Sequence, residues 1–355
     1  MPEIDIQKID MLITAFNLKP EGEEWDKTRK RSELDNFILN KAQNAKIYFD
    51  TDKTSTKMRR KKDDKKDCSV IKIKANGQQE LYLMSGHEQF LGEGSYGRAK
   101  LAIRIAPPDP DFTLYAIKRE WTDEPETKTL QALERMVGDK MQRASTTIKK
   151  RTQIPTNSNE NNKYYTVMPY LGKTLRAVMK TQQLDEKTKL DLSIQIALQL
   201  HDLHTKRHYA HLDLNPMNIT VDTSTPRVYK VNLIDFSLSK KLDLSHAELL
   251  KKNKKYIDFD VYSLKRILTQ PNDKLIDIKN LKAVNRVLYE MLKKNDVADT
   301  AAMIAANLIL HRLNLYPICV LSDANSLEII SCYEKDGTIS KEKLESLYPE
   351  NIFEA

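Results

Sequence analysis

Strand-like runs in the first half of the 355-residue chain give way to helical patterns in the second, and this order limits the possible folds more than any other feature. Short apolar or alternating runs, bounded by turn-forming residues, extend from Val70 to Met168 and predict a β-rich half. From Asp185 onward apolar residues recur at helical spacing, interrupted by a short β pair at 219–221 and 229–234. The chain is therefore predicted to be an α+β protein with two lobes.

The segments outside this pattern differ in composition. Residues 1–56 carry apolar side chains at helical spacing and predict a helical N-terminal extension. A basic linker is predicted at 57–68, with an anion-binding patch as the alternative, from the run Lys57, Arg59, Arg60, Lys61, Lys62, Lys65 and Lys66. The predicted division continues with the β-rich lobe and the segment joining the lobes at 69–172, a reduced helical lobe at 173–335 and a C-terminal tail at 336–355.

Composition narrows the class of protein. With 40% hydrophobic and 30% charged residues the chain is typical of a globular protein, and no apolar run approaches the roughly 18 residues of a membrane span. The N-terminus lacks the pattern of a secretory signal. Cys68, Cys319 and Cys332 lie far apart without CxxC spacing, which indicates neither a disulfide framework nor a zinc site. We expect a cytoplasmic protein, and the net charge of +8 is too modest to predict a nucleic-acid partner.

A glycine-rich turn lies between two predicted strands. Gly92, Gly94 and Gly97 form the pattern G-x-G-x-x-G, in which the absence of a Cβ lets backbone N–H groups approach phosphate oxygens. A plain hairpin turn is the alternative. A dinucleotide-binding motif needs a helix directly after the third glycine, whereas residues 98–105 form a strand pattern. The motif therefore indicates a flap over nucleotide phosphates.

Lys118 closes the run Tyr115-Ala-Ile-Lys118, twenty-one positions after Gly97. A lysine among apolar neighbours is costly to bury unless an anion meets it. An exposed lysine on an edge strand is the alternative, but its position after the glycine turn favours a cation that clamps phosphate.

Three polar residues follow an amphipathic helix and flank the short β pair. Asp213 and Asn218 lie in the run His-Leu-Asp-Leu-Asn-Pro-Met-Asn, and Asp235 lies in Ile-Asp-Phe-Ser. Phosphoryl transfer needs metal ions that neutralise charge and a carboxylate that orients the attacking hydroxyl. Each residue alone would suit an ordinary turn, but the three in this order predict a phosphotransferase site.

Taken together, these motifs resemble the signature set of protein kinases. The segment 167–172 is similar to the hinge between kinase lobes, and 258–264 is similar to the buried Asp-Val-Trp-Ser-Leu helix. The resemblance covers about residues 85–270. It implies a bilobal protein-kinase-like α+β fold, ATP and Mg²⁺ or Mn²⁺ as cofactors, and a protein substrate.

By that resemblance the three glycines cover the phosphates and Lys118 contacts the α- and β-phosphates. The backbone near Pro169 and Leu171 is expected to contact adenine, since proline loses only an N–H that this position need not donate. Glu134 is the predicted helix carboxylate paired with Lys118, and Glu126 is its competitor.

The resemblance also makes Asp213 the catalytic base and Asn218 and Asp235 the metal ligands. A Ser/Thr protein kinase is the preferred function because the glycine turn and Lys118 favour it. The run around Asp213 is also similar to small-molecule phosphotransferases of the aminoglycoside type. An ATP-binding pseudokinase scaffold is a third function, although retention of all four polar residues argues against it.

Four departures from the family pattern concern regulation and rate. Leu212 replaces the arginine that precedes the catalytic aspartate, and Asn215 stands where Ser/Thr kinases carry a phosphate-contacting lysine. Ser237 replaces the glycine after Asp-Phe. About twenty residues separate Asp235 from Asp258, without an Ala-Pro-Glu run, so the peptide-docking platform is predicted to be reduced.

Two further predictions concern partners and origin. The lysines Lys240, Lys241, Lys251, Lys252, Lys254 and Lys255 form either a solvated surface or a site at which a polyanion (an inositol polyphosphate, an anionic lipid head group or an acidic substrate) activates the enzyme. The wider pattern also resembles kinase-type effectors that some bacteria deliver into host cells. An acidic delivery signal or a solvated helix end would account for Glu342, Glu345, Glu350 and Glu354.

Overall fold

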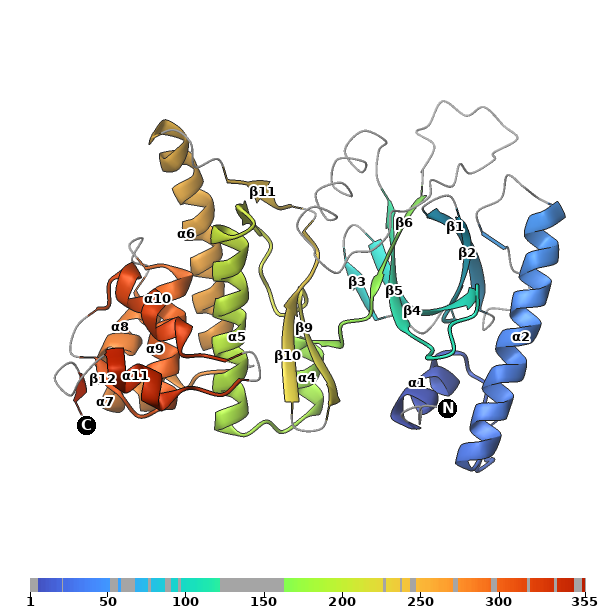
Figure 1. Cartoon of the computed structure of the whole chain (residues 1–355), viewed down its shortest axis with the longest axis horizontal. Helices are drawn as coiled ribbons and strands as arrows, with labels where there is room; N and C mark the ends of the chain where they lie inside the picture. The colour runs from blue at the N-terminus through green and yellow to red at the C-terminus, as the bar shows by residue number, and fades with distance from the viewer. Residues whose placement is uncertain are drawn as a thin grey trace. The chain divides into compact units, whose positions relative to one another are not determined.

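The computed structural model describes most of the chain in two compact units (Figure 1). One unit, here called the small lobe, covers Met1–Tyr170, and the other, the helical lobe, covers Leu171–Ala355. The described residues are 6–20, 22–51, 57–58, 68–75, 78–86, 91–94, 97–121, 163–225, 228–236, 238–242, 247–270, 274–294, 299–317, 320–334, 337–347 and 353–354.

A curled antiparallel sheet forms the centre of the small lobe. Its strands are β1 (Ser69–Ala75), β2 (Gln78–Met84), β3 (Gly92–Gly94), β4 (Gly97–Ala106), β5 (Leu114–Trp121) and β6 (Lys163–Pro169). They follow the order β1-β2-β4-β5-β6, and β3 pairs with β4. The five longer strands match strands predicted from the sequence. Gln89 and Phe90, part of another predicted strand, lie outside the described residues.

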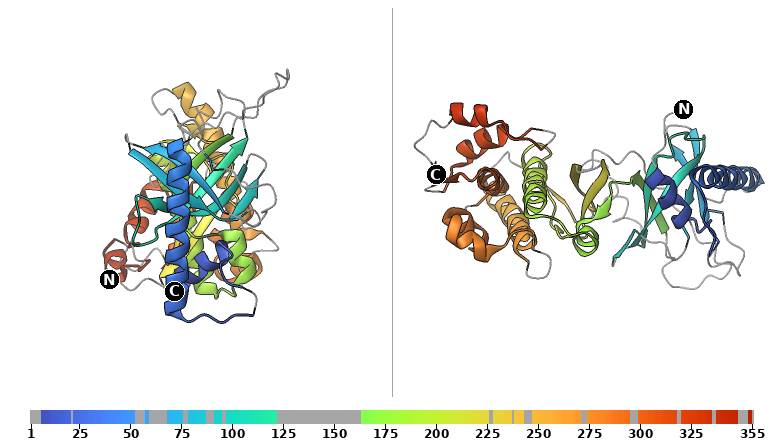
Figure 2. Two further views of the ribbon diagram at one scale, coloured as in Figure 1. Left: turned by 90° about the vertical axis from the view of Figure 1, so that its right-hand side faces the viewer. Right: turned by 90° about the horizontal axis from the view of Figure 1, so that it is seen from below.

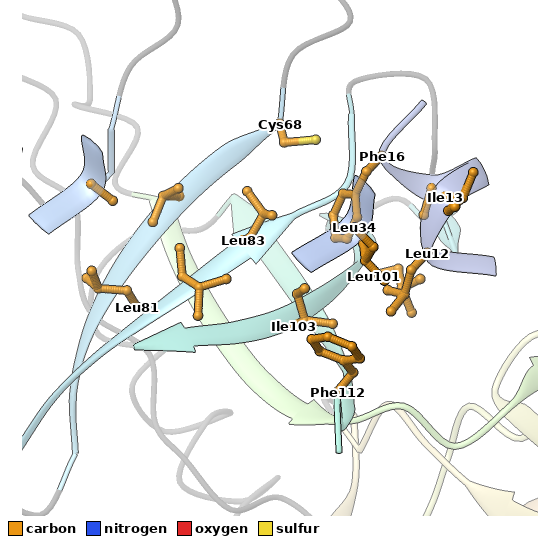
Figure 3. Close-up of a cluster of buried hydrophobic side chains, with 14 of the residues drawn as sticks. Leu12, Ile13, Phe16, Leu34, Cys68, Leu81, Leu83, Leu101, Ile103 and Phe112 are labelled. Carbon is orange, nitrogen blue, oxygen red and sulfur yellow. The ribbon is translucent and has the colours of Figure 1, made fainter. Parts of the chain in front are cut away.

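Two N-terminal helices, α1 (Ile6–Ala15) and α2 (Lys27–Thr51), confirm the predicted helical character of the first segment. They pack on the sheet rather than extending away from it, and Figure 2 shows α2 lying across the strands. The shared cluster is here called the N-terminal core (Figure 3). It consists of Ile9, Leu12, Ile13, Ala15, Phe16, Trp25, Leu34, Ala45, Phe49, Cys68, Val70, Leu81, Leu83, Leu101, Ile103, Ile105 and Phe112.

The opposite face of the sheet carries its own apolar cluster. It consists of Ile71, Ile73, Tyr82, Met84, Ala102, Tyr115, Ile117, Tyr165 and Val167. Side chains alternate between faces along each strand, so Leu101 in the N-terminal core and Ala102 in this second cluster mark the two sides of β4. Both faces are therefore covered, which fixes the register of every strand.

The helical lobe confirms the predicted change in secondary structure. Its helices are α4 (Leu175–Thr181), α5 (Glu186–Thr205), α6 (Ala247–Thr269), α7 (Ile278–Val284), α8 (Arg286–Lys293), α9 (Ala301–Arg312), α10 (Asp323–Ser331) and α11 (Lys341–Leu347). Short strands complete it: β7 (Lys173–Thr174), β8 (Tyr209–Ala210), β9 (Ile219–Thr225), β10 (Val228–Leu233), β11 (Lys240–Lys241), β12 (Tyr316–Pro317) and β13 (Phe353–Glu354). None of the helices in the described ranges is long and apolar enough to cross a membrane.

Helix α5 positions the hairpin that carries the predicted metal ligands. It starts at the N-cap Asp185, whose carboxylate accepts the Thr188 N–H at 2.7 Å. One side of α5 packs against α9 in the core of the lobe. On another side, Gln195 donates to the Tyr229 carbonyl at 2.9 Å and accepts the Val231 N–H at 3.0 Å. These two bonds hold β10, and with it the start of the segment that leads to Asp235, against the helix.

Candidate functional site

The glycine turn of the small lobe is a tight hairpin between β3 and β4. Gly92 pairs with Ala99 and Gly94 pairs with Gly97, while Ser95 and Tyr96 lie outside the described residues. The strand predicted after Gly97 is confirmed, because β4 starts at this glycine. A Cβ added at Gly92 would meet no atom of the described part of the chain within 4 Å. Open space rather than packing therefore adjoins this backbone, as a close approach to a phosphate group requires.

Lys118 lies within β5, with Ala99 of β4 and Thr166 of β6 as its cross-strand neighbours. Paired residues on adjacent strands point to the same face of a sheet. Leu101, two positions along from Ala99, belongs to the N-terminal core, so Lys118 shares its face with that core. Thr166 is only 2% exposed, and its hydroxyl has no hydrogen-bond partner among the described residues. A cation and an orphaned hydroxyl therefore occupy neighbouring positions on one face.

The predicted hinge, 167–172, starts within β6 and continues past its end at Pro169. Pro169 pairs with Tyr115 and closes the strand, and the Tyr170 N–H donates to the Leu114 carbonyl at 2.9 Å. Leu171 is the first residue of the helical lobe. The predicted partners of Lys118, Glu134 and its competitor Glu126, lie outside the described residues together with the helix predicted around them.

Gly172 has a structural requirement of its own. Its φ is +97°, a conformation that residues with side chains rarely adopt, and an added Cβ would lie 2.1 Å from the Val221 carbonyl oxygen. No other residue fits here without moving β9. The glycine therefore lets the chain run directly against the hairpin that carries Asn218.

Asp213 lies in the loop 211–218 that follows β8, and neighbours in the same loop orient its carboxylate. One carboxylate oxygen accepts Asn218 Nδ2 at 2.8 Å, and the other accepts Asn215 Nδ2 at 3.2 Å. The same two amide groups contact the Asp213 carbonyl oxygen, at 2.8 and 3.0 Å. Two donors on different oxygens fix the rotation of the carboxylate, which a positioned base requires.

Asn215 has a role that the sequence reasoning missed. The sequence pattern indicates only the loss of a phosphate-contacting lysine at this position. In the structure its Oδ1 accepts the Met217 N–H at 2.9 Å while its Nδ2 donates to Asp213. The side chain is thus fixed at both ends of its amide. Asn and Asp commonly bond to a backbone N–H two residues on, and this turn preference was the available signal.

Asp260 of α6 holds the start of the loop. It is fully buried, and it accepts the His211 N–H at 2.6 Å, the Leu212 N–H at 2.8 Å and His204 Nε2 at 2.9 Å. Leu212 has a φ of +62°, which costs free energy in a residue with a side chain. The bonds from Asp260 stabilise that conformation. The resemblance of 258–264 to a kinase helix was the signal for this residue, although it did not reveal the contacts.

His211 connects the loop to the segment before Asp235. Its Nε2 bonds to the Ile234 carbonyl at 3.1 Å and its Nδ1 accepts the Asp213 N–H at 3.3 Å, a pattern that only the neutral Nε2–H ring can form. Burial lowers the pKa of His211, against the opposing effect of Asp260, and so favours this neutral form. The imidazole also lies 5.2 Å from the Phe236 ring.

Asn218 and Asp235 meet at one end of the β9–β10 hairpin. Ile219 pairs with Leu233, and the Ile234 N–H donates to the Asn218 carbonyl at 2.9 Å, so Asp235 comes one residue beyond the position opposite Asn218. Asp235 has a φ of +63°, which turns the chain sharply at this point. Because Asn218 Nδ2 faces Asp213, its Oδ1 faces away. One carboxylate and one amide oxygen fit Mg²⁺, which takes one or two protein carboxylates together with substrate phosphates and water.

The structure departs from the expected buried helix at 258–264. Asp260, Val261 and Leu264 are buried, but Phe259 is 50% exposed and Tyr262 is 40% exposed. Only one side of α6 therefore faces the core. Ser237, a predicted departure from the kinase pattern, lies outside the described residues.

Comparison with known families decides what this arrangement is. A family model described as the protein kinase domain matches residues 86–305, more than half of the chain. The chain belongs to the protein kinase family. Among curated proteins, no match to this kinase was found. The matched segment contains the glycine turn, Lys118, the loop around Asp213 and Asp235.

Family membership confirms several predictions at a coarse level. The fold is that of a bilobal protein kinase, and the kinase domain supports an ATP-dependent phosphotransferase activity. Protein kinases generally use ATP with Mg²⁺, so the oxygen donors at Asn218 and Asp235 agree with the chemistry of the family. The family also makes a protein the expected kind of substrate.

Proposed function

We propose that this kinase transfers the γ-phosphoryl group of ATP to a serine or threonine hydroxyl of a protein. The observation that supports this most directly is the orientation of the Asp213 carboxylate by Asn215 and Asn218. A carboxylate held in this way can accept the proton of an attacking hydroxyl and aim its oxygen. The remaining residues of the loop serve to keep that carboxylate in place.

The other proposed residues bind the nucleotide and the metal ion. Lys118 and the backbone at Gly92, Gly94 and Gly97 bind phosphate oxygens, and the hinge backbone at Pro169 and Leu171 contacts adenine. Asn218 and Asp235 hold Mg²⁺ or Mn²⁺, which supplies positive charge against the phosphates. Glu134, or its competitor Glu126, pairs with Lys118. Each of these assignments is a proposal built on the family pattern and the local geometry.

We also propose a cytoplasmic site of action and an anionic partner. Cys332 is a buried thiol that forms no disulfide with the described residues, as suits a reducing compartment. Lys240 and Lys241 are exposed on β11, and Lys254 and Lys255 are exposed on α6, which supports anion binding there. Delivery into a host cell as a bacterial effector is a proposal from resemblance alone.

The test uses purified full-length protein, labelled ATP, Mg²⁺ or Mn²⁺ and a mixed protein lysate. We expect label on protein serine or threonine, with turnover lowered about 10²-fold or more in Asp213→Ala while nucleotide affinity is retained. Asp235→Ala should instead lose metal-dependent ATP binding, measured by calorimetry. Label that appears only on small molecules would favour the aminoglycoside type of kinase, and ATP binding without turnover would favour a pseudokinase.

A further inference from the structure

Helix α6 presents an unusual surface, here called the basic–aromatic face: Lys254, Lys255, Phe259, Tyr262 and Arg266. Within residues 253–269 every residue classed as exposed is one of these five. Phe259 and Tyr262 expose 50% and 40% of their surface. Exposed single apolar residues are ordinary, but two aromatic rings among three cations, with no exposed carboxylate in that stretch, form a distinctive chemical pattern.

The spacing joins four of these five residues, all but Lys254, into one stripe. Lys255, Phe259, Tyr262 and Arg266 follow each other at four, three and four positions, which places them on one side of a helix. The Arg266 guanidinium lies 5.8 Å from the centre of the Tyr262 ring, near enough for a cation–π contact. The buried residues Asp260, Leu264 and Leu268 occupy the other side. The helix therefore has apolar residues on its buried side and, unusually, aromatic rings among the cations on its exposed side.

The stripe lies on the helix whose buried side holds the loop 211–218. Phe259 immediately precedes Asp260, which accepts the His211 and Leu212 N–H groups and so holds the loop of Asp213. A segment bound along the stripe would therefore lie on the same helix that holds the loop of the proposed base. The short stretch between Asp235 and Asp258 contains no Ala-Pro-Glu run, so another surface has to bind the substrate.

We propose that the basic–aromatic face docks an acidic segment of the protein substrate in which aromatic or large apolar side chains alternate with carboxylates. The three cations supply charge complementarity, and the two rings supply apolar surface that only a segment with its own apolar side chains would cover. A polyphosphate would use the lysines and leave the rings exposed. This inference rests on the proposed protein-kinase function, and it selects the acidic substrate among the possible anionic partners.

The test measures binding of a synthetic peptide of glutamates interrupted by phenylalanines to the full-length protein, by fluorescence anisotropy. The double variant Phe259→Ser, Tyr262→Ser should bind about tenfold more weakly or worse, as expected when aromatic anchors are removed. The matched control replaces two exposed apolar residues elsewhere in the helical lobe, Val284→Ser and Leu327→Ser, which are 49% and 47% exposed. This control should bind like the wild type.

A second pair of variants tests the charges. Peptide binding to exposed lysines should weaken as salt is added, because salt screens exposed charges over about 10 Å at 0.1 M. The double variant Lys254→Glu, Lys255→Glu removes these charges and should therefore abolish the salt-sensitive part of binding. The control, Lys279→Glu with Lys282→Glu on α7, changes the net charge equally at exposed positions and should bind normally. Fusing the same peptide to a serine substrate should lower KM for the wild type and not for either face variant, with kcat unchanged.

Several outcomes would overturn the proposal. Equal binding of a phenylalanine-free glutamate peptide, or unchanged binding by the serine variant, would show that the rings play no part. Tighter binding of inositol hexakisphosphate or of phosphatidylserine vesicles, competing with the peptide, would assign the lysines to a polyphosphate or a membrane. Asp213-dependent phosphorylation without peptide binding would refute the docking proposal and leave the proposed kinase function standing. Peptide binding without any phosphorylation would refute the proposed function and leave a binding surface.

Discussion

The loop 211–218 of the helical lobe and the N-terminal core of the small lobe each support part of the proposed site, but different forces hold them. The loop depends on directional hydrogen bonds: Asp260 accepts three donors, and Asn215 and Asn218 both donate to Asp213. The N-terminal core is apolar, and Leu12 and Leu34 within it are completely buried. One region is specified by polar geometry and the other by packing.

The difference follows from what each region has to hold. The loop includes a left-handed residue at Leu212 and leads to a carboxylate whose orientation matters. Irregular backbone of this kind needs specific partners because no ladder supplies them. The sheet that carries Lys118 already has its own hydrogen bonds, so covering its faces is sufficient to keep the register. Damage to the loop should therefore affect turnover most, and damage to the core should affect stability most.

Asp260→Ala should produce the largest effect. It leaves the His211 and Leu212 N–H groups and His204 without their acceptor, and each buried unsatisfied group costs about 1–3 kcal/mol. We expect turnover to fall about 10²-fold or more, together with a lower free energy of unfolding in urea. Asp258→Ala, two positions earlier on the same helix, is the control. Near-normal turnover in Asp260→Ala would show that the loop keeps its geometry without this acceptor.

Leu12→Ala should separate stability from chemistry. Removing a buried leucine side chain costs about 2–5 kcal/mol, and here the loss falls on the N-terminal core. We expect the midpoint of thermal unfolding to fall while kcat at low temperature stays close to wild type. Leu39→Ala, on α2 at a position 58% exposed, is the matched control and should change neither quantity. A large loss of kcat in Leu12→Ala would mean that packing also sets the catalytic geometry.

Asn215→Ala should lower kcat about tenfold, equivalent to roughly 1.4 kcal/mol, without changing KM for ATP. Its effect acts through the orientation of Asp213 rather than through nucleotide binding. Asn215→Asp provides the decisive comparison. That variant keeps an oxygen for the Met217 N–H but replaces the donor to Asp213 with a second negative charge. If Asn215 only shaped the turn, kcat of Asn215→Asp would resemble that of the wild type. If Asn215 positions Asp213, kcat of Asn215→Asp should be lower than that of Asn215→Ala.

The pH dependence of stability should be the smallest effect, and its sign should differ between the two lobes. Burial lowers the pKa of His211, so its contribution to folding stability is present above the unfolded value of about 6.5 and is lost as pH falls below it. Burial raises the pKa of Tyr82, on the other face of the small-lobe sheet, above its usual value of 10.0. That contribution is present below pH 10 and is lost as pH rises further.

Unfolding in urea across the pH range checks both signs. Tyr82→Phe should remove part of the loss of unfolding free energy above pH 10, because the hydroxyl that donates to Glu80 at 2.7 Å is then absent. The loss of unfolding free energy at acid pH should be unchanged. A loss at acid pH that changes in Tyr82→Phe would show that the two lobes do not titrate independently.

Local patterns in the sequence determined the elements and the order of the chemical groups. Alternating apolar residues identified the long strands, and the turn between Gly92 and Gly97 joins the short strand β3 to the long strand β4. The run around Asp213 and the Asp-Phe pair after β10 identified the candidate site, because the spacing along a loop or hairpin is read directly from the chain. The assignment to protein kinases rested on the same local motifs.

Tertiary structure decided which distant groups meet and which surfaces stay exposed. Asp260 lies 49 positions from His211, and no periodicity shows that its carboxylate caps that backbone. Sequence reasoning likewise took the helix at 258–264 for a buried one, whereas Phe259 and Tyr262 face outward. Nor did it show that α1 and α2 cover the sheet face of Lys118. Such features depend on how separate elements pack, and a side chain's own sequence neighbours carry little information about that.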